Sequence, residues 1–583
     1  MTNRSSDIIR RGLAISLMAA TTPTPAQPHY AHPGWIAQAT LNRSNDGQTD
    51  LKAMVEKAEK LRTEANYESA AALWQQILNV IENRFGPDHP YLATSLDNLA
   101  EILRKEGKYP EAEPLYRRAL AIRERALGPD HPDVATSLNN LAFFLRAQGQ
   151  YIAAEPLIRR SLAIREKALG TDHPDVAASL NNLAGLLRDQ GHYATAEPLY
   201  RRSLAIYEKA LGPDHPNIAS SLNNLAVLLM RQGQYIAAVP LYRRSLAIYE
   251  KALGPDHPNI ATSLDNLAGL LRKQGKYPCL LYTSDAALTI HERALGPDHP
   301  EVATSLSNLA GLLEDQGQYA EAEPQYRRSL AIREKALGTD HPDIATSLNN
   351  LAVLLMRQAR YAEAGPLYRR SLAIREKALG TDHPEVAGSL NNLANFLRDQ
   401  GQYATAEPLL RRALAIDAKT QGPDHPDVAT SLNNLALLLM TQGRYAEASP
   451  FFRRALAIRE KSLGANHPDV ATSLDNLAGL LVRQGNYAAA DPLIRRALAI
   501  DAKNLGPNHP DIATSLNNLA GLLMNEGHYD GAEPLLRRSL SIREKALGTD
   551  HPDVAISLEG LALLLMAKGQ YVSAVSYTHL RAH

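Results

Sequence analysis

The chain is poor in the residues that mark several protein classes. Its 583 residues include one cysteine, two tryptophans and six phenylalanines. No stretch approaches the roughly 20 apolar residues that a membrane-spanning helix needs. A single cysteine excludes a disulfide scaffold and any multi-cysteine zinc or iron–sulfur site. Basic and acidic residues number 62 each, so the net charge is zero with His neutral. That balance excludes a strongly basic nucleic-acid-binding protein and an acidic tail protein.

The sequence instead repeats one short pattern. Tyrosine supplies 24 of the few aromatic residues, and 45% of all residues are hydrophobic, which is enough to build a core. The tripeptide Asp-His-Pro or a close variant recurs every 42 residues without insertion or deletion. Its histidines are His89, His131, His173, His215, His257, His299, His341, His383, His425, His467, His509 and His551. A fixed period of this length indicates a solenoid rather than several unrelated domains.

Each repeat predicts two helices joined by a turn. In the repeat that begins at His131, one helical face collects Val134, Leu138, Leu141, Ala142 and Leu145. Pro132 suits the first turn of this helix, and Gly149 ends it. A second periodic stretch follows, with Pro156 expected in its first turn and Gly170 at its end. Neither helix can bury its apolar face alone, so neighbouring repeats have to stack.

The motifs Asn-Leu-Ala-x-x-Leu, Gln-Gly-x-Tyr and Ala-Glu-Pro-Leu-Tyr-Arg-Arg-Ser-Leu-Ala-Ile resemble the tetratricopeptide repeat. The 42-residue period is similar to the long-loop repeats of kinesin light chain and its bacterial relatives. The resemblance covers residues 51–574. It implies an all-α, right-handed solenoid of about 12 complete repeats plus a truncated one, with the first helices on the concave surface. Residues 51–86 lack the Asn pair and carry Trp74, as expected for a terminal cap.

Two segments abandon the repeat. They are 279–287, within the stretch that follows Tyr277, and 575–583 at the C-terminal end. One DNA string read in two frames encodes both Cys279-Leu-Leu-Tyr-Thr-Ser and Val575-Ser-Tyr-Thr-His-Leu, and it resembles the transposon end used in sequencing adapters. We expect both segments to be artefacts, so that Cys279 is not native and the native gene continues beyond 574. The preserved 42-residue register across 279–287 stays unexplained.

The N-terminal region resembles a secretory signal peptide. Three arginines precede a short apolar run that starts at Gly12, and a Thr-Pro-Ala sequence follows. We expect a signal peptide over 1–26, a linker over 27–50 and an exported protein. The alternatives are a disordered extension and a cytoplasmic protein.

Functional positions are sought where the repeats differ. Counted from each repeat's histidine, the first helix varies at offsets +8, +12, +15 and +16, which share one helical face distinct from the apolar packing face. The resemblance implies that this varied stripe lines a peptide-binding groove. Its candidate basic residues are Arg104, Arg146, Arg188, Arg231, Arg272, Arg357 and Arg398. Most of these cations lie in the first half of the stripe, and the second half carries Met356, Met440, Val482 and Met524. We therefore hypothesise that an acidic peptide stretch binds the first half and an apolar stretch the second half.

An asparagine ladder runs beside the stripe at offset +9 and breaks at Gly560. An amide both donates and accepts hydrogen bonds, so a row of amides suits the backbone of an extended peptide. The alternative is that these residues tie neighbouring helices together or were copied by duplication. The ladder consists of Asn98, Asn140, Asn182, Asn224, Asn266, Asn308, Asn350, Asn392, Asn434, Asn476 and Asn518.

The remaining polar residues favour structural roles. Packed helices lie about 8–10 Å apart, too far for equivalent histidines to share a metal ion, so we expect each histidine in the loop that enters a helix. The Arg-Arg pairs, such as Arg159–Arg160, are expected to be solvated or to pair with the glutamates of the same repeats. No catalytic motif and no cofactor site is recognisable.

The sequence is compatible with three functions. The first is a non-catalytic scaffold that binds a protein or an extended peptide. The second is the sensor arm of a larger bacterial protein with a C-terminal effector, such as a caspase-like protease, which a catalytic His and Cys beyond 574 would establish. The third is a structural spacer, which random scatter of the varied positions would have favoured. The partner and the oligomeric state stay open.

Overall fold

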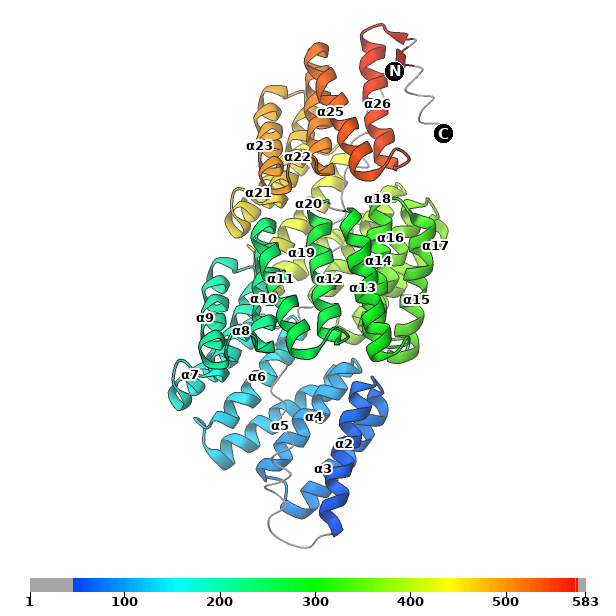
Figure 1. Ribbon diagram of the computed structural model, residues 1–583. Coiled ribbons are helices and arrows are strands. Elements are labelled where there is room, and N and C mark those ends of the chain that lie inside the picture. The colour runs from blue at the N-terminus through cyan, green and yellow to red at the C-terminus, as the bar shows by residue number, and fades with distance from the viewer. Residues whose placement is uncertain (1–45, 276, 572, 575–583) are drawn as a thin grey trace.

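The computed structural model describes residues 46–275, 277–571 and 573–574, and within them every regular element is a helix. The helices form 12 hairpins, α2–α3 to α24–α25, followed by α26 (Figure 1). The first helices are α2 (Asp46–Thr63), α4 (Pro90–Lys105), α6 (Pro132–Ala147), α8 (Pro174–Asp189), α10 (Pro216–Arg231), α12 (Pro258–Lys273), α14 (Pro300–Asp315), α16 (Pro342–Arg357), α18 (Pro384–Asp399), α20 (Pro426–Thr441), α22 (Pro468–Arg483), α24 (Pro510–Asn525) and α26 (Pro552–Ala567).

The second helices are α3 (Tyr67–Phe85), α5 (Tyr109–Leu127), α7 (Tyr151–Leu169), α9 (Tyr193–Leu211), α11 (Tyr235–Leu253), α13 (Tyr277–Leu295), α15 (Tyr319–Leu337), α17 (Tyr361–Leu379), α19 (Tyr403–Gln421), α21 (Tyr445–Leu463), α23 (Tyr487–Leu505) and α25 (Tyr529–Leu547). The solenoid predicted from the period is therefore confirmed.

The His-Pro pair starts each first helix from α4 to α26. His131, for example, is extended, and its Nδ1 accepts a hydrogen bond from the backbone N–H of Asp133 at 3.1 Å. Pro132 then occupies the first helical position, where its missing N–H costs nothing. Gly149 follows the helix with a φ of 65°, a left-handed value that suits glycine. The loop position predicted for the histidines is thus confirmed, and each one is a helix cap.

The predicted place of Pro156 is wrong. The second helix α7 begins at Tyr151, so this proline is its sixth residue and lies inside the helix. It therefore removes one backbone hydrogen bond to the carbonyl of Ile152. Pro156 and Ile152 are both exposed, so water can satisfy that carbonyl. The sequence pattern placed the helix start too late because the apolar periodicity was counted from Ala154, although Tyr151 lies three residues earlier on the same stripe.

The first helices form the inner face of the solenoid and the second helices form the outer face. Successive first helices such as α8, α10 and α12 contact one another, whereas successive second helices in the described chain do not approach to the same extent. This asymmetry curves the stack, because the second helices spread on the convex side. The concave placement that the family resemblance implied for the first helices is therefore confirmed.

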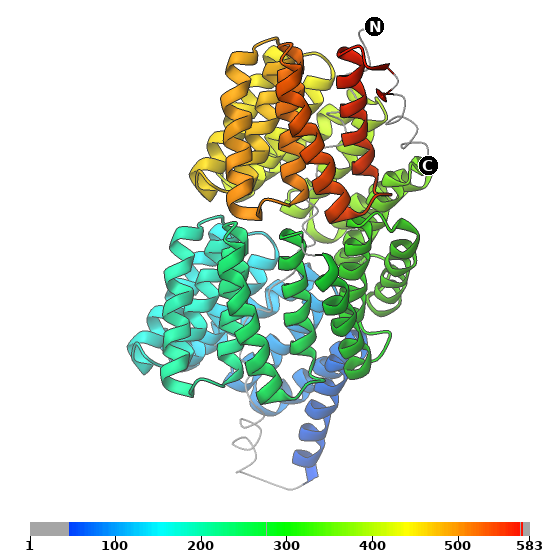
Figure 2. The same cartoon turned by 45° about the horizontal axis from the view of Figure 1, so that its top comes forward.

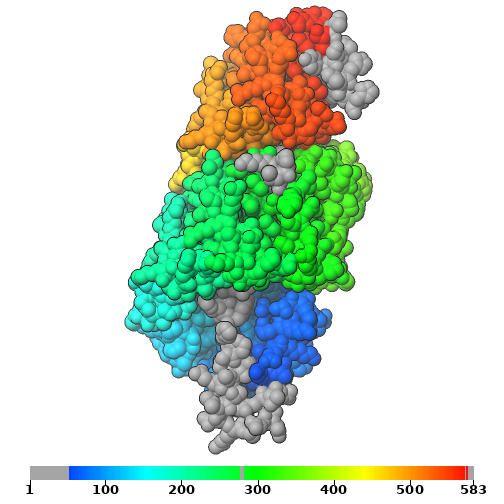
Figure 3. Space-filling view, viewed as in Figure 1, coloured from blue at the N-terminus to red at the C-terminus, as the bar shows by residue number. Residues whose placement is uncertain are grey.

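The stack closes into two superimposed turns. Helices α20 to α26 lie above helices α6 to α12 (Figures 1 and 2), and on the surface the orange and red part of the chain lies above the cyan and green part (Figure 3). His341, His425 and His467 place Nε2 3.0 Å from the carbonyl oxygens of Lys105, Asp189 and Arg231. Each such pair is separated by 236 residues. Between five and six repeats therefore make one turn, and we call these hydrogen bonds the inter-turn contact.

Glycine is required in the turns that receive these histidines. A Cβ on Gly149 or Gly233 would lie 2.6 Å from the Cδ atom of Pro384 or Pro468. Nδ1 of each histidine already accepts its cap hydrogen bond, so Nε2 carries the proton and donates it across the turns. One side chain therefore caps its own helix and joins two turns of the superhelix.

The N-terminal region, segment 279–287 and the C-terminal segment differ in how much of them the structure describes. The signal-peptide prediction for 1–26 and the terminal segment 575–583 lie outside the described residues. Helix α2 begins at Asp46, so the last residues of the predicted linker 27–50 are helical. Helix α13 has the same 19-residue length as α11 and α15, so the altered segment 279–287 does not interrupt the helix. Within the described chain, no helix is long and apolar enough to cross a membrane.

Candidate functional site

The varied stripe does not form one surface. Offset +8 is buried in most repeats, and several residues at +12 and +15, such as Val353, Leu437 and Met440, are buried as well. Asp97, at +8, is 6% exposed and pairs with Arg123 of the second helix α5. Arg123 also donates to Ser137 at the start of the next first helix. The expectation that +8 belongs to the groove is therefore wrong, because this position packs against the following repeat.

We call this buried cluster the joint. It consists of the residue at +8, the second-helix residue at +34, and the serine at +6 of the next repeat. In most repeats the residue at +34 is an arginine that bonds to the serine of the next repeat. Arg165, for example, donates to Ser179 Oγ at 2.8 Å. In the joint after His383, Asn391 donates to Ser431 Oγ at 2.8 Å and Ser431 donates to Asp417 at 2.6 Å.

The joint after His467 contains two acids. Ser515 Oγ lies 3.1 Å from Asp475 Oδ2 and 3.2 Å from Asp501 Oδ2. One hydroxyl has one proton to donate, so both contacts are hydrogen bonds only if one carboxyl is protonated. Burial, and then neighbouring acids, raise the pKa of Asp501 to about 8. Burial also raises the pKa of Asp475 to about 7. Sequence reasoning missed offset +34, although its change from Arg to Tyr, His or Asp was visible.

The asparagine ladder bridges neighbouring first helices. Nδ2 of Asn182 donates to Asn139 Oδ1 of the preceding repeat at 2.8 Å, and Asn476 donates to Asn433 at 2.9 Å. Asn434 makes the same bridge. Four ladder residues are buried, namely Asn140, Asn224, Asn266 and Asn350, and the other seven are half-buried. The structure thus supplies the tie between helices that the sequence analysis held as the alternative, and contact with a peptide stays a prediction.

The candidate arginines are mostly paired with acids of the same stripe. Arg146 and Arg188 both contact Asp189, with Arg188 Nη2 2.7 Å from its Oδ1. Burial alone would raise the pKa of Asp189, but the two guanidinium charges outweigh it and lower the pKa to about 2. Arg104 pairs with Glu101 at 2.6 Å and lies 5.0 Å from the ring centroid of Phe143.

Three of the other candidate arginines are also paired with acids of the stripe. Three further pairs are Arg272–Asp315, Arg357–Glu314 and Arg398–Asp399. Arg231 ends α10, and its carbonyl receives the inter-turn hydrogen bond of His467. These ion pairs neutralise much of the positive charge on which the acidic-peptide hypothesis depends. Part of the sequence variation along the stripe therefore pairs a charge of one repeat with the opposite charge of the next repeat.

Several repeats carry glycine at offset +12, and the helix backbone there is covered by an arginine side chain in some repeats and uncovered in others. A Cβ on Gly185 would meet the Arg146 guanidinium at 3.1 Å, and Gly311 is covered by Arg272 in the same way. Among the described residues, no atom lies within 4 Å of an added Cβ at Gly269, Gly479 and Gly521. At these three positions the helix backbone is bare on the inner face, so a ligand can approach it closely.

The histidines and arginine pairs have structural partners. Among the described residues, no three His, Cys, Asp or Glu side chains are grouped so that they could hold a metal ion. Arg159 pairs with Glu155 in its own helix at 2.8 Å, and Arg160 pairs with Glu124 of the preceding repeat at 2.6 Å. The expected pairing with a glutamate of the same repeat is confirmed for Arg159 and wrong for Arg160, whose partner lies in the preceding repeat.

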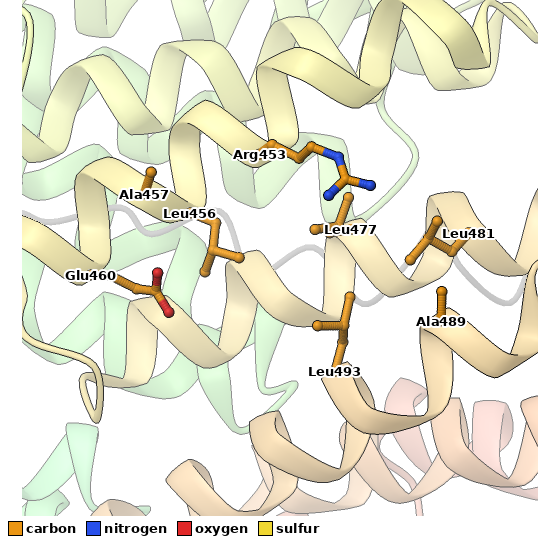
Figure 4. Close-up of a pocket in the computed structure, with 8 residues that line it drawn as sticks. All are labelled: Arg453, Leu456, Ala457, Glu460, Leu477, Leu481, Ala489 and Leu493. Atoms are coloured by element: carbon orange, nitrogen blue, oxygen red, sulfur yellow. The ribbon is translucent and has the colours of Figure 1, made fainter.

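A shallow hollow of about 350 Å³ lies on the outer side, between α21 and α23 above α22 (Figure 4). Its lining residues are Arg453, Leu456, Ala457, Glu460, Leu477, Leu481, Ala489 and Leu493. Arg453 faces Ser449, at 3.5 Å, where most repeats have a glutamate that binds this arginine. The hollow is apart from the inner face and contains none of the predicted site residues.

Comparisons with known proteins agree with this geometry. Tetratricopeptide repeat profiles match nine segments between residues 133 and 523, which overlap except between 278 and 281, and two more at 92–133 and 512–553. No curated protein shows significant similarity. A crystal structure of a Podosopora anserina protein, described as a putative kinesin light chain with nearly identical TPR-like repeats, is 31% identical. It covers 34% of this chain and 95% of that one, with a TM-score of 0.30.

A single-substitution variant of that protein is 32% identical, with the same coverage and a TM-score of 0.31. BtubC (BKLC) from P. vanneervenii is 23% identical over 41% of this chain and 93% of its own, with a TM-score of 0.32. The profiles match most of the chain, in register with hairpins whose first helices share a curved inner face. The chain therefore belongs to the tetratricopeptide repeat family.

Proposed function

We propose that the protein is a non-catalytic scaffold that binds a protein or an extended peptide along its inner face. The single observation that carries the proposal is the bare helix backbone at Gly269, Gly479 and Gly521, where no described atom lies within 4 Å of an added Cβ. Tetratricopeptide repeats typically bind proteins or peptides, which supports the choice of ligand. The zero net charge argues against a nucleic acid.

A groove-filling variant tests this function. The substitutions Gly269→Phe, Gly479→Phe and Gly521→Phe place a ring where a Cβ meets no other atom. Phe143 occupies the same offset in its own repeat, so the fold accepts this residue type there. Peptides selected from a random display library against the full chain should bind the triple variant about tenfold more weakly or worse.

The matched control places larger side chains on the outer face instead of the inner face. Ile152→Phe and Ile236→Phe change side chains of the second helices that are 73% and 75% exposed. Fluorescence anisotropy of the selected peptides should give unchanged dissociation constants for this control. If the outer variant loses affinity and the inner variant does not, the inner face is not the binding surface.

A further inference from the structure

The hollow between α21 and α23, which we call the outer hollow, lies where the chain departs from its own repeat. In seven repeats the arginine at offset +28 is bound by an acid four residues earlier in its helix, as Arg411 is by Glu407 at 2.7 Å. In α21 this acid is replaced by Ser449, whose Oγ lies 3.5 Å from Arg453 Nε. Arg453 is exposed, and no acidic side chain of the described residues pairs with it.

The following repeat supplies no acid either. A glutamate at offset +22 of the next second helix can approach the same arginine, as Glu363 approaches Arg327 at 3.9 Å. At this offset α23 carries Ala489. Two small side chains, Ser449 and Ala489, therefore stand where other repeats carry glutamates, and the outer hollow opens beside them. Space and an unpaired cation thus occur at the same place.

Two other repeats with this arginine also lack the acid, but there the position is filled. At Gly365 the ring of Phe396 from the next repeat lies 3.1 Å from an added Cβ, and Val239 is itself an apolar side chain packed against the core. Arg369, four residues after Gly365, likewise has no acidic partner among the described residues. An unpaired arginine therefore also occurs beside a filled position, and Arg369 provides a natural control for Arg453.

The lining of the outer hollow is largely apolar. Four leucines from α21, α22 and α23 line it (Figure 4). Glu460, which lies two helical turns after Arg453 in α21, is bound by Arg496 at 2.6 Å, so its charge is offset. The charge that the hollow offers to a ligand is therefore that of Arg453. Its volume of about 350 Å³ lies at the small end of ligand sites and suits one or two apolar side chains.

We propose that the outer hollow binds a protein segment in which an apolar side chain stands beside the carboxylate of an Asp or Glu residue. The apolar side chain enters the hollow, and the carboxylate takes the place of the missing glutamate at Arg453. The chain itself shows this pairing, because Arg411 donates from Nε and Nη2 to one oxygen of Glu407 at 3.3 and 2.7 Å. Small-molecule sites bury most of their ligand, which a shallow hollow cannot do, so a larger partner with further contacts on the outer helices is favoured.

Restoring the acid of the other repeats should close the site. Ser449→Glu gives Arg453 the partner that Glu407 gives to Arg411, so the fold should accept it. A random peptide display library is first depleted on this variant and then selected on the unaltered full chain. Depletion removes peptides that bind the inner face, because the variant keeps that face. The peptides that remain should carry Leu, Ile, Met or Phe beside Asp or Glu.

Fluorescence anisotropy then compares the affinity of the selected peptides for three variants of the full chain. Ser449→Glu should weaken binding about tenfold or more, because it occupies Arg453 and repels the carboxylate of the peptide. Arg453→Gln should weaken binding about threefold, as expected for the loss of an exposed ion pair. The matched control Arg369→Gln removes an arginine that also lacks an acid but stands beside Phe396, and it should leave the affinity unchanged.

Circular dichroism checks that the variants are folded, and depletion uses Arg453→Gln if Ser449→Glu is not. No enrichment after depletion, enriched peptides without an acid, or equal loss of affinity in Arg369→Gln and Arg453→Gln would overturn the proposal. The inner-face variant Gly269→Phe, Gly479→Phe, Gly521→Phe should bind these peptides as the unaltered chain does. Failure of this proposal and failure of the proposed function are therefore separate outcomes, because the two sites lie on opposite faces of the solenoid.

Discussion

At the residue scale, the joint shows how one substitution changes the chemistry of a buried contact. Asp97 faces Arg123, and the opposite charges offset the cost of burial. Asp475 faces Asp501 at the same two offsets, with Ser515 between them. The hydroxyl cannot donate to both carboxylates, so one carboxyl of this joint carries a proton, which the joint of Asp97 and Arg123 does not require.

This proton makes the stability of the joint depend on pH. Both carboxyls have a folded-state pKa above the usual value near 3.8. The folded state therefore binds more protons than the unfolded state between about pH 4 and 8, and stability falls as pH rises through that window. We expect Asp475→Asn to remove most of this loss, about 1–3 kcal/mol at pH 8. The amide can donate to Ser515, as Asn391 donates to Ser431.

Hydrogen exchange of α24 at pH 5 and pH 8 measures this effect. A suitable control is Asn433→Asp, which creates an acid beside Arg459 and should add no alkaline loss. If the unaltered chain protects α24 equally at both pH values, the shared proton is absent.

At the element scale, helix α13 keeps the backbone of its neighbours but not their core. Ser284 is 1% exposed and occupies the offset at which α11 and α15 carry Tyr242 and Tyr326. The large apolar cluster of the first repeats ends at Leu270, and the next begins at Leu309. Between them lies the small cluster of Ala268 and Leu312. Among the described side chains the core is therefore thinner beside α13, where serine stands at the offset of a ring.

Restoring the ring should stabilise the centre of the solenoid. We expect Ser284→Tyr to raise the free energy of unfolding of the hairpins around α13 by about 1–3 kcal/mol, because the added ring buries apolar area. Tyr242→Ser, which recreates the gap in an intact repeat, should cost about 3–5 kcal/mol. Denaturant unfolding followed by hydrogen exchange separates the two regions. A destabilised Ser284→Tyr variant would show that the site cannot accept a ring.

At the scale of the whole molecule, the inter-turn contact decides the shape. Six histidine loops of the second turn rest on turns of the first, each through a few atoms. Neighbouring repeats pack over whole helices, whereas the two turns meet only at their edges. The solenoid is therefore stable along its chain and more easily opened between its turns.

Two glycine variants isolate that contact. Gly233→Ala and Gly443→Ala place alanine at similar φ values of 70° and 76°, so their backbone strain is alike. Only Gly233 has a proline atom 2.6 Å from the added Cβ. In dilute solution we expect Gly443→Ala to cost about 1 kcal/mol and to leave the shape unchanged. Gly233→Ala should lengthen the molecule in small-angle X-ray scattering, and equal profiles for both would contradict an inter-turn contact in solution.

The sequence by itself determined everything that repeats locally. The His-Pro start, the turn glycine and the apolar periodicity predict both helices of every repeat, because capping and amphipathicity act within a few residues. The late start predicted for α7 is the exception, since the periodicity was counted from Ala154 and not from Tyr151. The position of the first helices on the concave side followed from the family resemblance.

Only the tertiary structure decided contacts between distant repeats. Arg146 meets Asp189 across 43 residues, and His467 meets Arg231 across 236. The small rotation from one repeat to the next accumulates along the stack, and no local pattern encodes where its turns meet. The same reason explains why offset +8 lies in the joint and why the candidate arginines are paired. A single helix shows which residues share a face, but the neighbouring repeat decides what that face contacts.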